Sequence, residues 1–222
     1  HLAAPKVVQV TLNITVPAFP PGTVYLRRYI NPDGTGGDWN PAATALSQMS
    51  PVLWSRTFDI LDGTQMEFKF ARGSWETVMK GADGNVELPN LSLAVDYGLD
   101  GTQTYEYTVL NWRDPLVVSV SPIDAAVDVP TDTTITITWS QAMPADDCPS
   151  LHALGGSITG TCAYNETTFT HTFTPYASLA GLTLHNAAAA GKTDAGGDVQ
   201  QVPYNWTFTT EGYLVYLPLV FK

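Results

Sequence analysis

The sequence predicts an all-β protein with two antiparallel β-sandwich domains in tandem, followed by a hydrophobic C-terminal strand. Three observations support this prediction. Apolar and polar side chains alternate over short runs, which is the period of a half-buried strand. Turn-forming pairs such as Asp62-Gly63 and Arg72-Gly73 separate nearly all of these runs. Finally, 222 residues suffice for two domains that each bury a core of their own.

The first domain, residues 1–114, opens on the clearest strand, at 8–16. Aliphatic side chains occupy every second position there, and Gln, Thr and Asn lie between them. One face therefore packs on a core while the other meets water. Two tryptophans, Trp54 and Trp112, are expected inside that core. Further strands are expected at 24–29, 53–60, 65–71, 75–79, 87–95 and 104–110.

The second domain, residues 115–211, starts after a hinge at Asp114-Pro115. Proline restricts the residue before it and interrupts strand pairing. A strand is expected at 117–120. Another is expected at 134–139, where Ile135, Ile137 and Trp139 alternate with threonines.

Cys148 and Cys162 are the only cysteines, and both lie in the second domain. Two thiols without a nearby His or Cys pair cannot complete a tetrahedral zinc site. We therefore predict a disulfide between them, which implies an oxidising, extracytoplasmic location. The sequence begins at His1 rather than Met. It is therefore either a trimmed sequence or a mature secreted protein whose signal peptide has been removed, and we expect the second.

Several short motifs follow one another along residues 6–114. They are Gly37-Asp38-Trp39-Asn40-Pro41, Leu53-Trp54-Ser55, Glu67-Phe68-Lys69-Phe70, Trp75-Glu76 and Pro89-Asn90. Together they resemble the starch-binding modules of carbohydrate-binding family 20 and their relatives attached to amylopullulanases. Residues 69–78 are especially similar to the amylopullulanase-associated modules.

That resemblance implies a starch site of two exposed Trp rings and a Lys, in which the rings stack on the apolar faces of glucose. By motif position, the glycan-binding residues are Trp39, Lys69, Trp75 and Asn90. The alternative is that Trp39 and Trp75 cap the core, because Trp is highly buried on average.

A second set of motifs spans residues 115–210. It comprises the run from Ser121-Pro122-Ile123-Asp124 to Val129-Pro130, then Ser140-Gln141-Ala142-Met143, Phe173-Thr174-Pro175 and Trp206-Thr207-Phe208. These motifs closely resemble the bacterial Ig-like domains of S-layer proteins and large secreted proteins. The resemblance implies a Greek-key sandwich that acts as a spacer or assembly module and has no catalytic residues.

The last segment, residues 212–222, does not alternate as a half-buried strand would. Both of its faces are apolar, so both should leave water. Left unpaired, such a strand is an aggregation hazard. It pairs either with its own second domain or with a neighbouring molecule. The residues of this assembly strand are Tyr213, Leu214, Val215, Tyr216, Leu217, Leu219, Val220 and Phe221.

Composition excludes several classes of function. The formal net charge is −11, so there is no basic surface to meet nucleic acid or an anionic membrane. No apolar run is long enough to insert into a membrane. The histidines are scattered and no nucleophile motif occurs, so we expect no enzyme activity, no metal and no cofactor. Sequons at Asn13, Asn90, Asn165 and Asn205 permit glycosylation.

Two hypotheses for function follow. In the first, the chain is an extracellular structural protein, a subunit of a cell-surface assembly or filament. Its partners are copies of itself or other surface proteins, joined by β-strand addition. In the alternative, it is a carbohydrate-binding module that recognises starch-like α-glucan through exposed Trp residues. Burial of both Trp39 and Trp75 would exclude the second hypothesis.

Overall fold

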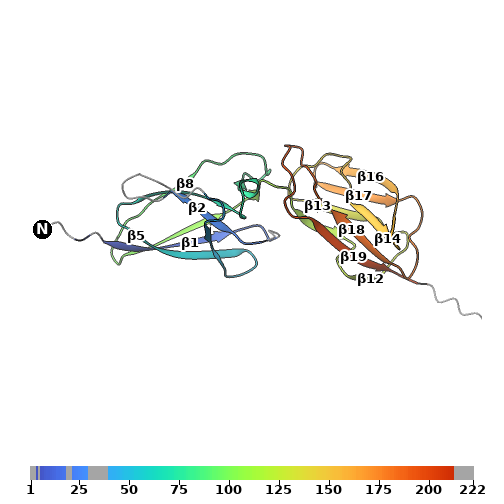
Figure 1. Cartoon of the computed structure of the whole chain (residues 1–222), viewed down its shortest axis with the longest axis horizontal. Coiled ribbons are helices and arrows are strands. Elements are labelled where there is room, and N and C mark those ends of the chain that lie inside the picture. Colours follow the sequence, from blue (N-terminus) through green and yellow to red (C-terminus); the bar gives the residue numbers. More distant parts are fainter. Residues whose placement is uncertain (1–3, 5, 19–21, 30–39, 213–222) are drawn as a thin grey trace, which may run out of the picture. The chain divides into compact units, whose positions relative to one another are not determined.

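A computed structural model describes residues 4, 6–18, 22–29 and 40–212 of the chain (Figure 1). Strands dominate it, as the sequence predicts, and the described residues contain no α-helix. The chain divides into two compact units. The first takes the residues up to Leu116 together with Gly196–Gln201, and the second takes Val117–Ala195 and the residues from Val202 onward. Asp114 therefore belongs to the first unit.

Two four-stranded sheets and one strand pair build the first unit. One sheet has the order β4 (Ser47–Gln48), β5 (Leu53–Leu61), β1 (Val7–Thr15) and β9 (Thr102–Thr108). The other has the order β3 (Thr44–Ala45), β2 (Tyr25–Tyr29), β6 (Gln65–Ala71) and β8 (Leu91–Ala94). The pair joins β7 (Met79–Lys80) to β10 (Asn111–Trp112).

The alternating pattern at residues 8–16 places its aliphatic face in the core, as predicted. Val8, Val10, Leu12 and Ile14 are completely buried in β1. They pack with Trp54, Trp112 and the Phe side chains of β6, so the expected core positions of both tryptophans are confirmed. β1 pairs antiparallel with β5 but parallel with β9. The sheet is therefore mixed, because β9 arrives through a long connection that allows either direction.

Two expected strands of the first unit are wrong in part. Residues 75–77 form a turn of 3-10 helix, η1 (Trp75–Thr77), and only Met79–Lys80 is strand. Here the Thr77 hydroxyl donates to the Ser74 carbonyl and accepts from the Ser74 amide. Such local bonds compete with strand pairing. In the segment 87–95, only Leu91–Ala94 is strand.

The second unit consists of two sheets. One has the order β11 (Val117–Ser121), β13 (Ile135–Trp139), β17 (Thr170–Pro175) and β16 (Gly160–Asn165). The other has the order β12 (Ala126–Val129), β19 (Tyr204–Thr210), β18 (Leu184–Ala189), β14 (Ser150–Ala153) and β15 (Gly156–Ser157). All neighbours are antiparallel except β12 and β19. Ile135, Ile137 and Trp139 are buried, as their alternation predicts.

Cys148 and Cys162 form the predicted disulfide, with their Cα atoms 5.9 Å apart. Cys162 lies on β16, an outer strand of its sheet, and Cys148 lies in the segment before β14. The disulfide therefore links strand β16 of one sheet to the segment that leads into strand β14 of the other sheet. Residues 213–222, which include the predicted assembly strand, lie outside the described residues, so that strand stays a prediction.

Candidate functional site

Trp75 differs from every other tryptophan that the structure describes. Its side chain is 43% exposed, whereas Trp54, Trp112, Trp139 and Trp206 are at most 6% exposed. Trp75 begins η1, which follows β6 after the short connection 72–74. The chain turns out of β6 at Gly73, whose φ of +101° is a conformation that glycine adopts freely. The turn therefore presents an aromatic ring to solvent.

Lys69 lies on the face of β6 opposite the core and is nevertheless buried. Its Nζ donates to Glu87 Oε1 at 2.5 Å, and Lys80 Nζ on β7 donates to Glu87 Oε2 at 2.6 Å. The Glu87 carboxylate thus binds both lysines. The two lysine side chains are less than a tenth exposed, whereas the Glu87 side chain is 61% exposed. We name Lys69, Lys80 and Glu87 the Glu87 cluster.

Asn90 lies just before β8, beside the same sheet. Its Nδ2 donates to Glu67 Oε2 at 3.2 Å. Glu67 is two residues before Lys69 on β6, so the two side chains share the outer face of that strand. The structure therefore places Asn90 and Lys69 on one sheet, each bound to a carboxylate, and places Trp75 in the turn after it. Trp39, the fourth predicted residue, lies outside the described residues.

Sequence reasoning did not predict that carboxylates bind the polar residues of this surface. Lys69 was predicted to contact glycan, but its ammonium group is already bound to Glu87. Glu87 is 18 residues from Lys69 along the chain and belongs to no motif that would mark it. Only the tertiary structure shows that the segment before β8 brings Glu87 to Lys69 on β6 and Lys80 on β7.

The charge of Glu87 depends on its two lysines. Partial burial opposes ionisation of this carboxyl group, but the hydrogen bonds and charges of Lys69 and Lys80 outweigh that effect and hold its pKa below the usual value of 4.5. A carboxyl group with a lowered pKa stabilises the folded state above its unfolded-state pKa. That contribution is lost as the pH falls through the folded-state pKa.

We expect Glu87→Gln to destabilise the first unit by about 1 kcal/mol at pH 7, because two nearly buried lysines lose their counter-charge while solvent screens the exposed carboxylate. The difference from the parent protein should shrink as the pH falls through the lowered folded-state pKa of Glu87, since the carboxyl group is then protonated. Native-state hydrogen exchange of the β6 amides measures both values. Glu166→Gln, a change at an exposed loop residue, is the matched control. A difference that stayed constant over the whole acid range in which the first unit remains folded would contradict this role for Glu87.

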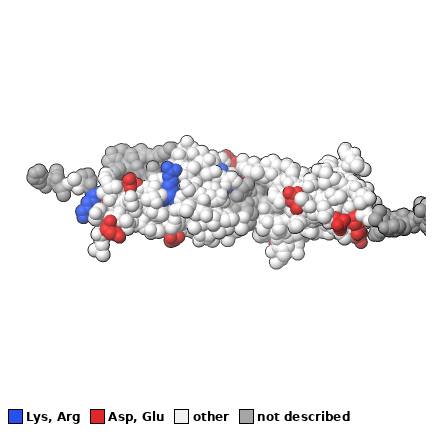
Figure 2. Space-filling view, turned by 90° about the horizontal axis from the view of Figure 1, so that it is seen from below, with Lys and Arg blue, Asp and Glu red and all other residues white. Residues whose placement is uncertain are grey.

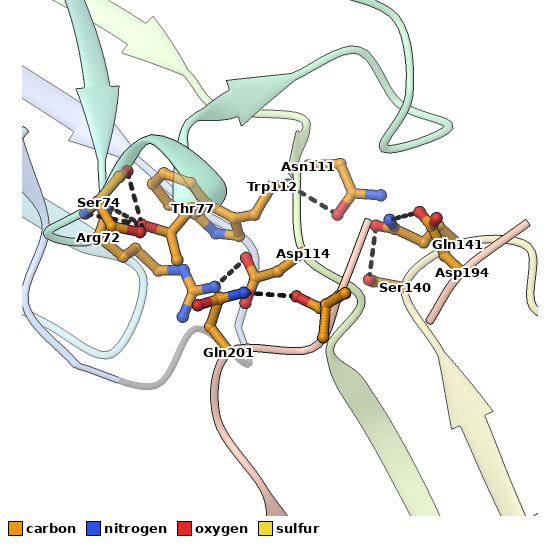
Figure 3. Close-up of polar contacts among 11 residues, drawn as sticks. Arg72, Ser74, Thr77, Asn111, Trp112, Asp114, Ser140, Gln141, Asp194 and Gln201 are labelled. Atoms are coloured by element: carbon orange, nitrogen blue, oxygen red, sulfur yellow. Dashed lines mark hydrogen bonds and ion pairs between the residues drawn. The ribbon is translucent and has the colours of Figure 1, made fainter. Parts of the chain in front are cut away.

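A buried ion pair lies behind η1 (Figure 3). Arg72 Nη2 donates to Asp114 Oδ1, and both side chains are at most 1% exposed. The Arg72 guanidinium also lies over the Trp112 ring, 5.4 Å from its centroid. Burial raises the pKa of Asp114, and Arg72 opposes that rise. The pair anchors the end of β6 from which Gly73 and Trp75 extend.

Neither a metal centre nor a membrane helix is found in the part of the chain that the structure describes. No group of three His, Cys, Asp or Glu side chains is placed to hold an ion there. No described helix is long and apolar enough to cross a bilayer. The sequons lie on β1 (Asn13), before β8 (Asn90), at the end of β16 (Asn165) and on β19 (Asn205).

Comparisons with known proteins relate this chain to one domain family and to two glycan-acting enzymes, in each case over about half of its length. Residues 113–210 match the family model described as bacterial Ig-like domain. The chain is 34% identical over 122 residues to an amylopullulanase of Thermoanaerobacter thermohydrosulfuricus, covering 54% of this chain and 8% of the relative. It is 33% identical over 115 residues to an amylopullulanase of Thermoanaerobacterium thermosulfurigenes, covering 52% of this chain and 6% of the relative.

Among solved structures, the chain is similar to a family 15 glucoamylase from Hypocrea jecorina. The identity is 24% and the TM-score is 0.34, with 50% of this chain and 18% of that chain covered. The match to each of the two amylopullulanases covers less than a tenth of that enzyme's length. The finer assignments to carbohydrate-binding family 20 and to the S-layer type stay predictions.

Proposed function

We propose that this chain is a non-catalytic accessory part of an extracellular glycoside hydrolase and that its first domain binds starch-like α-glucan at Trp75. The exposed ring of Trp75 carries this proposal, because the four other described tryptophans are buried in the cores. The amylopullulanase relatives support the same substrate class. They favour the carbohydrate-binding hypothesis over the filament hypothesis.

Binding at Trp75 would use an aromatic face together with hydrogen-bonding groups. An indole ring offers a large apolar surface to the C–H face of a glucose unit. Asn90, Glu67 and Glu87 could meet the hydroxyl groups, since amide and carboxylate oxygens accept hydrogen bonds. Lys69 then acts as a positioning residue that holds Glu87. Trp39 remains the predicted second ring.

The second domain serves as a spacer in this proposal. Its match to the bacterial Ig-like family supports that role. The Cys148–Cys162 disulfide suits an oxidising compartment outside the cytoplasm.

The surface of the protein also suits a neutral polymer. The face seen in Figure 2 is largely uncharged, with isolated acidic and basic side chains.

Trp75→Ala should weaken binding of maltoheptaose by about tenfold or more, since losing an aromatic contact of about 1.4 kcal/mol lowers affinity tenfold. Isothermal titration calorimetry on the full chain measures this loss, and retarded migration in starch-containing gels gives a second readout. Met49→Ala removes another exposed apolar side chain of the first unit and should leave binding unchanged. Equal affinity of the Trp75→Ala and parent proteins would refute the proposed site.

A further inference from the structure

The second unit carries an exposed aromatic ring of its own. Tyr176 follows directly on β17 and is 73% exposed. A hollow of about 330 Å³ and a second of about 140 Å³ share Tyr176, Ala177 and Ser178 in their linings. Tyr176 therefore lies between the two hollows. A linear ligand that occupied both hollows would pass over its ring.

The segment that carries Tyr176 is held at both ends by backbone hydrogen bonds. The Tyr176 amide donates to the Thr159 carbonyl at 3.1 Å, and the Leu179 amide donates to the Thr131 carbonyl at 2.7 Å. The Leu179 side chain is buried in the core of this unit. Thr159 lines the larger hollow and Thr131 the smaller one. The backbone of the segment is thus fixed to a wall of each hollow, so binding would require little ordering of the loop.

Both hollows are lined by groups that suit an uncharged, hydroxyl-rich ligand. Hydroxyl groups come from Ser157, Thr159 and Ser178 in the larger hollow and from three threonines in the smaller one. Among the lining residues that the structure describes, Asp132 in the smaller hollow is the one carboxylic acid, and none is Lys or Arg. The described lining therefore offers an anionic ligand such as a phosphate no Lys or Arg side chain.

A buried histidine completes the lining of the larger hollow. His185 stacks on Phe208 with ring centroids 5.1 Å apart. Neither of its ring nitrogens makes a hydrogen bond of ordinary geometry within the described protein. Burial lowers the pKa of His185, and the nearby Ala180 carbonyl opposes this only in part. The imidazole is therefore neutral at pH 7 and adds no charge to the lining.

We propose that Tyr176 and the two adjoining hollows form a second glycan-binding site, which takes a neutral oligosaccharide across the Tyr176 ring. One sugar unit would stack on the ring, and its neighbours would enter the hollows and bond to the hydroxyl groups and Asp132. An aromatic ring flanked by hydroxyl groups matches the alternating C–H and O–H faces of a sugar. This site goes beyond the proposed function, since it lies in the other domain and depends on different residues.

The test uses the full chain and maltoheptaose, with cellohexaose as a second neutral probe. We expect either sugar to shift the backbone NMR signals of Tyr176, Ser178 and Thr133. Tyr176→Ala should raise the dissociation constant measured from these signals by about tenfold or more, whereas Tyr176→Phe keeps the ring and should retain binding. Leu182→Ala, at an equally exposed apolar residue outside both linings, is the matched control.

Two further variants separate this site from the one at Trp75. Asp132→Asn should weaken the second site without disturbing the core, because Asp132 is exposed. Trp75→Ala should leave the shifts at Tyr176 intact. No shift at Tyr176 with either sugar, or equal affinity after Tyr176→Ala, would overturn the second site and leave the first untouched. Persistent shifts at Tyr176 with no effect of Trp75→Ala on the total affinity would instead refute only the first site.

Discussion

Replacing Arg72 by Met should destabilise the first domain by about 3–5 kcal/mol, the usual result of leaving one partner of a buried ion pair without its counter-charge. Arg72 and Asp114 are both at most 1% exposed, so water cannot compensate the remaining carboxylate. Urea unfolding of the Arg72→Met variant, followed by hydrogen exchange of the β1 and β6 amides, measures the loss. Because the pair supports the turn that carries Trp75, glucan binding should weaken as well.

Two comparisons show whether the uncompensated charge is the cause. The double variant Arg72→Met/Asp114→Leu should recover most of the stability, because apolar side chains of similar size often replace a buried pair without loss. Lowering the pH should also reduce the defect of Arg72→Met. Burial already raises the pKa of Asp114, and without Arg72 the folded state takes up a proton more readily. A defect that persists in the double variant and at low pH would mean that Arg72 acts through packing alone.

Removal of the disulfide should destabilise the second domain by about 3 kcal/mol, the value for a closed loop of about 15 residues. Cys148 and Cys162 are 14 positions apart, and their bond ties β16 to the segment before β14. Differential scanning calorimetry should show the transition of this domain at lower temperature in the Cys148→Ser/Cys162→Ser protein. The transition of the first domain should not move.

Reduction provides the matched control for the disulfide. Dithiothreitol should lower the same transition in the parent protein and have no effect on the double serine variant. If the serine variant unfolded at the parent temperature, the loop before β14 would be held by other contacts. The ion pair of Lys192 with Asp147, at 2.6 Å, is the nearest candidate in sequence.

Local patterns predicted the parts of this protein that depend on local chemistry. The period of two in residues 8–16 places Val8, Val10, Leu12 and Ile14 in the core, because successive side chains of a strand point to opposite faces. The disulfide was predictable because only one pairing of two cysteines exists within a chain. The expected strand at 75–79 failed because hydrogen bonds between Ser74 and Thr77 form a turn there.

The candidate sites depend on contacts between distant segments, which no local pattern encodes. Trp75 could be assigned to an aromatic motif, but whether its ring faces solvent depends on the turn at Gly73. Lys69 was expected to meet a ligand, yet Glu87 reaches it from beyond β7. The surroundings of Tyr176 come from four segments, near residues 131, 158, 176 and 185. Alternation along a strand determines which side chains are buried, whereas the order and register of the paired strands decide which exposed ones meet.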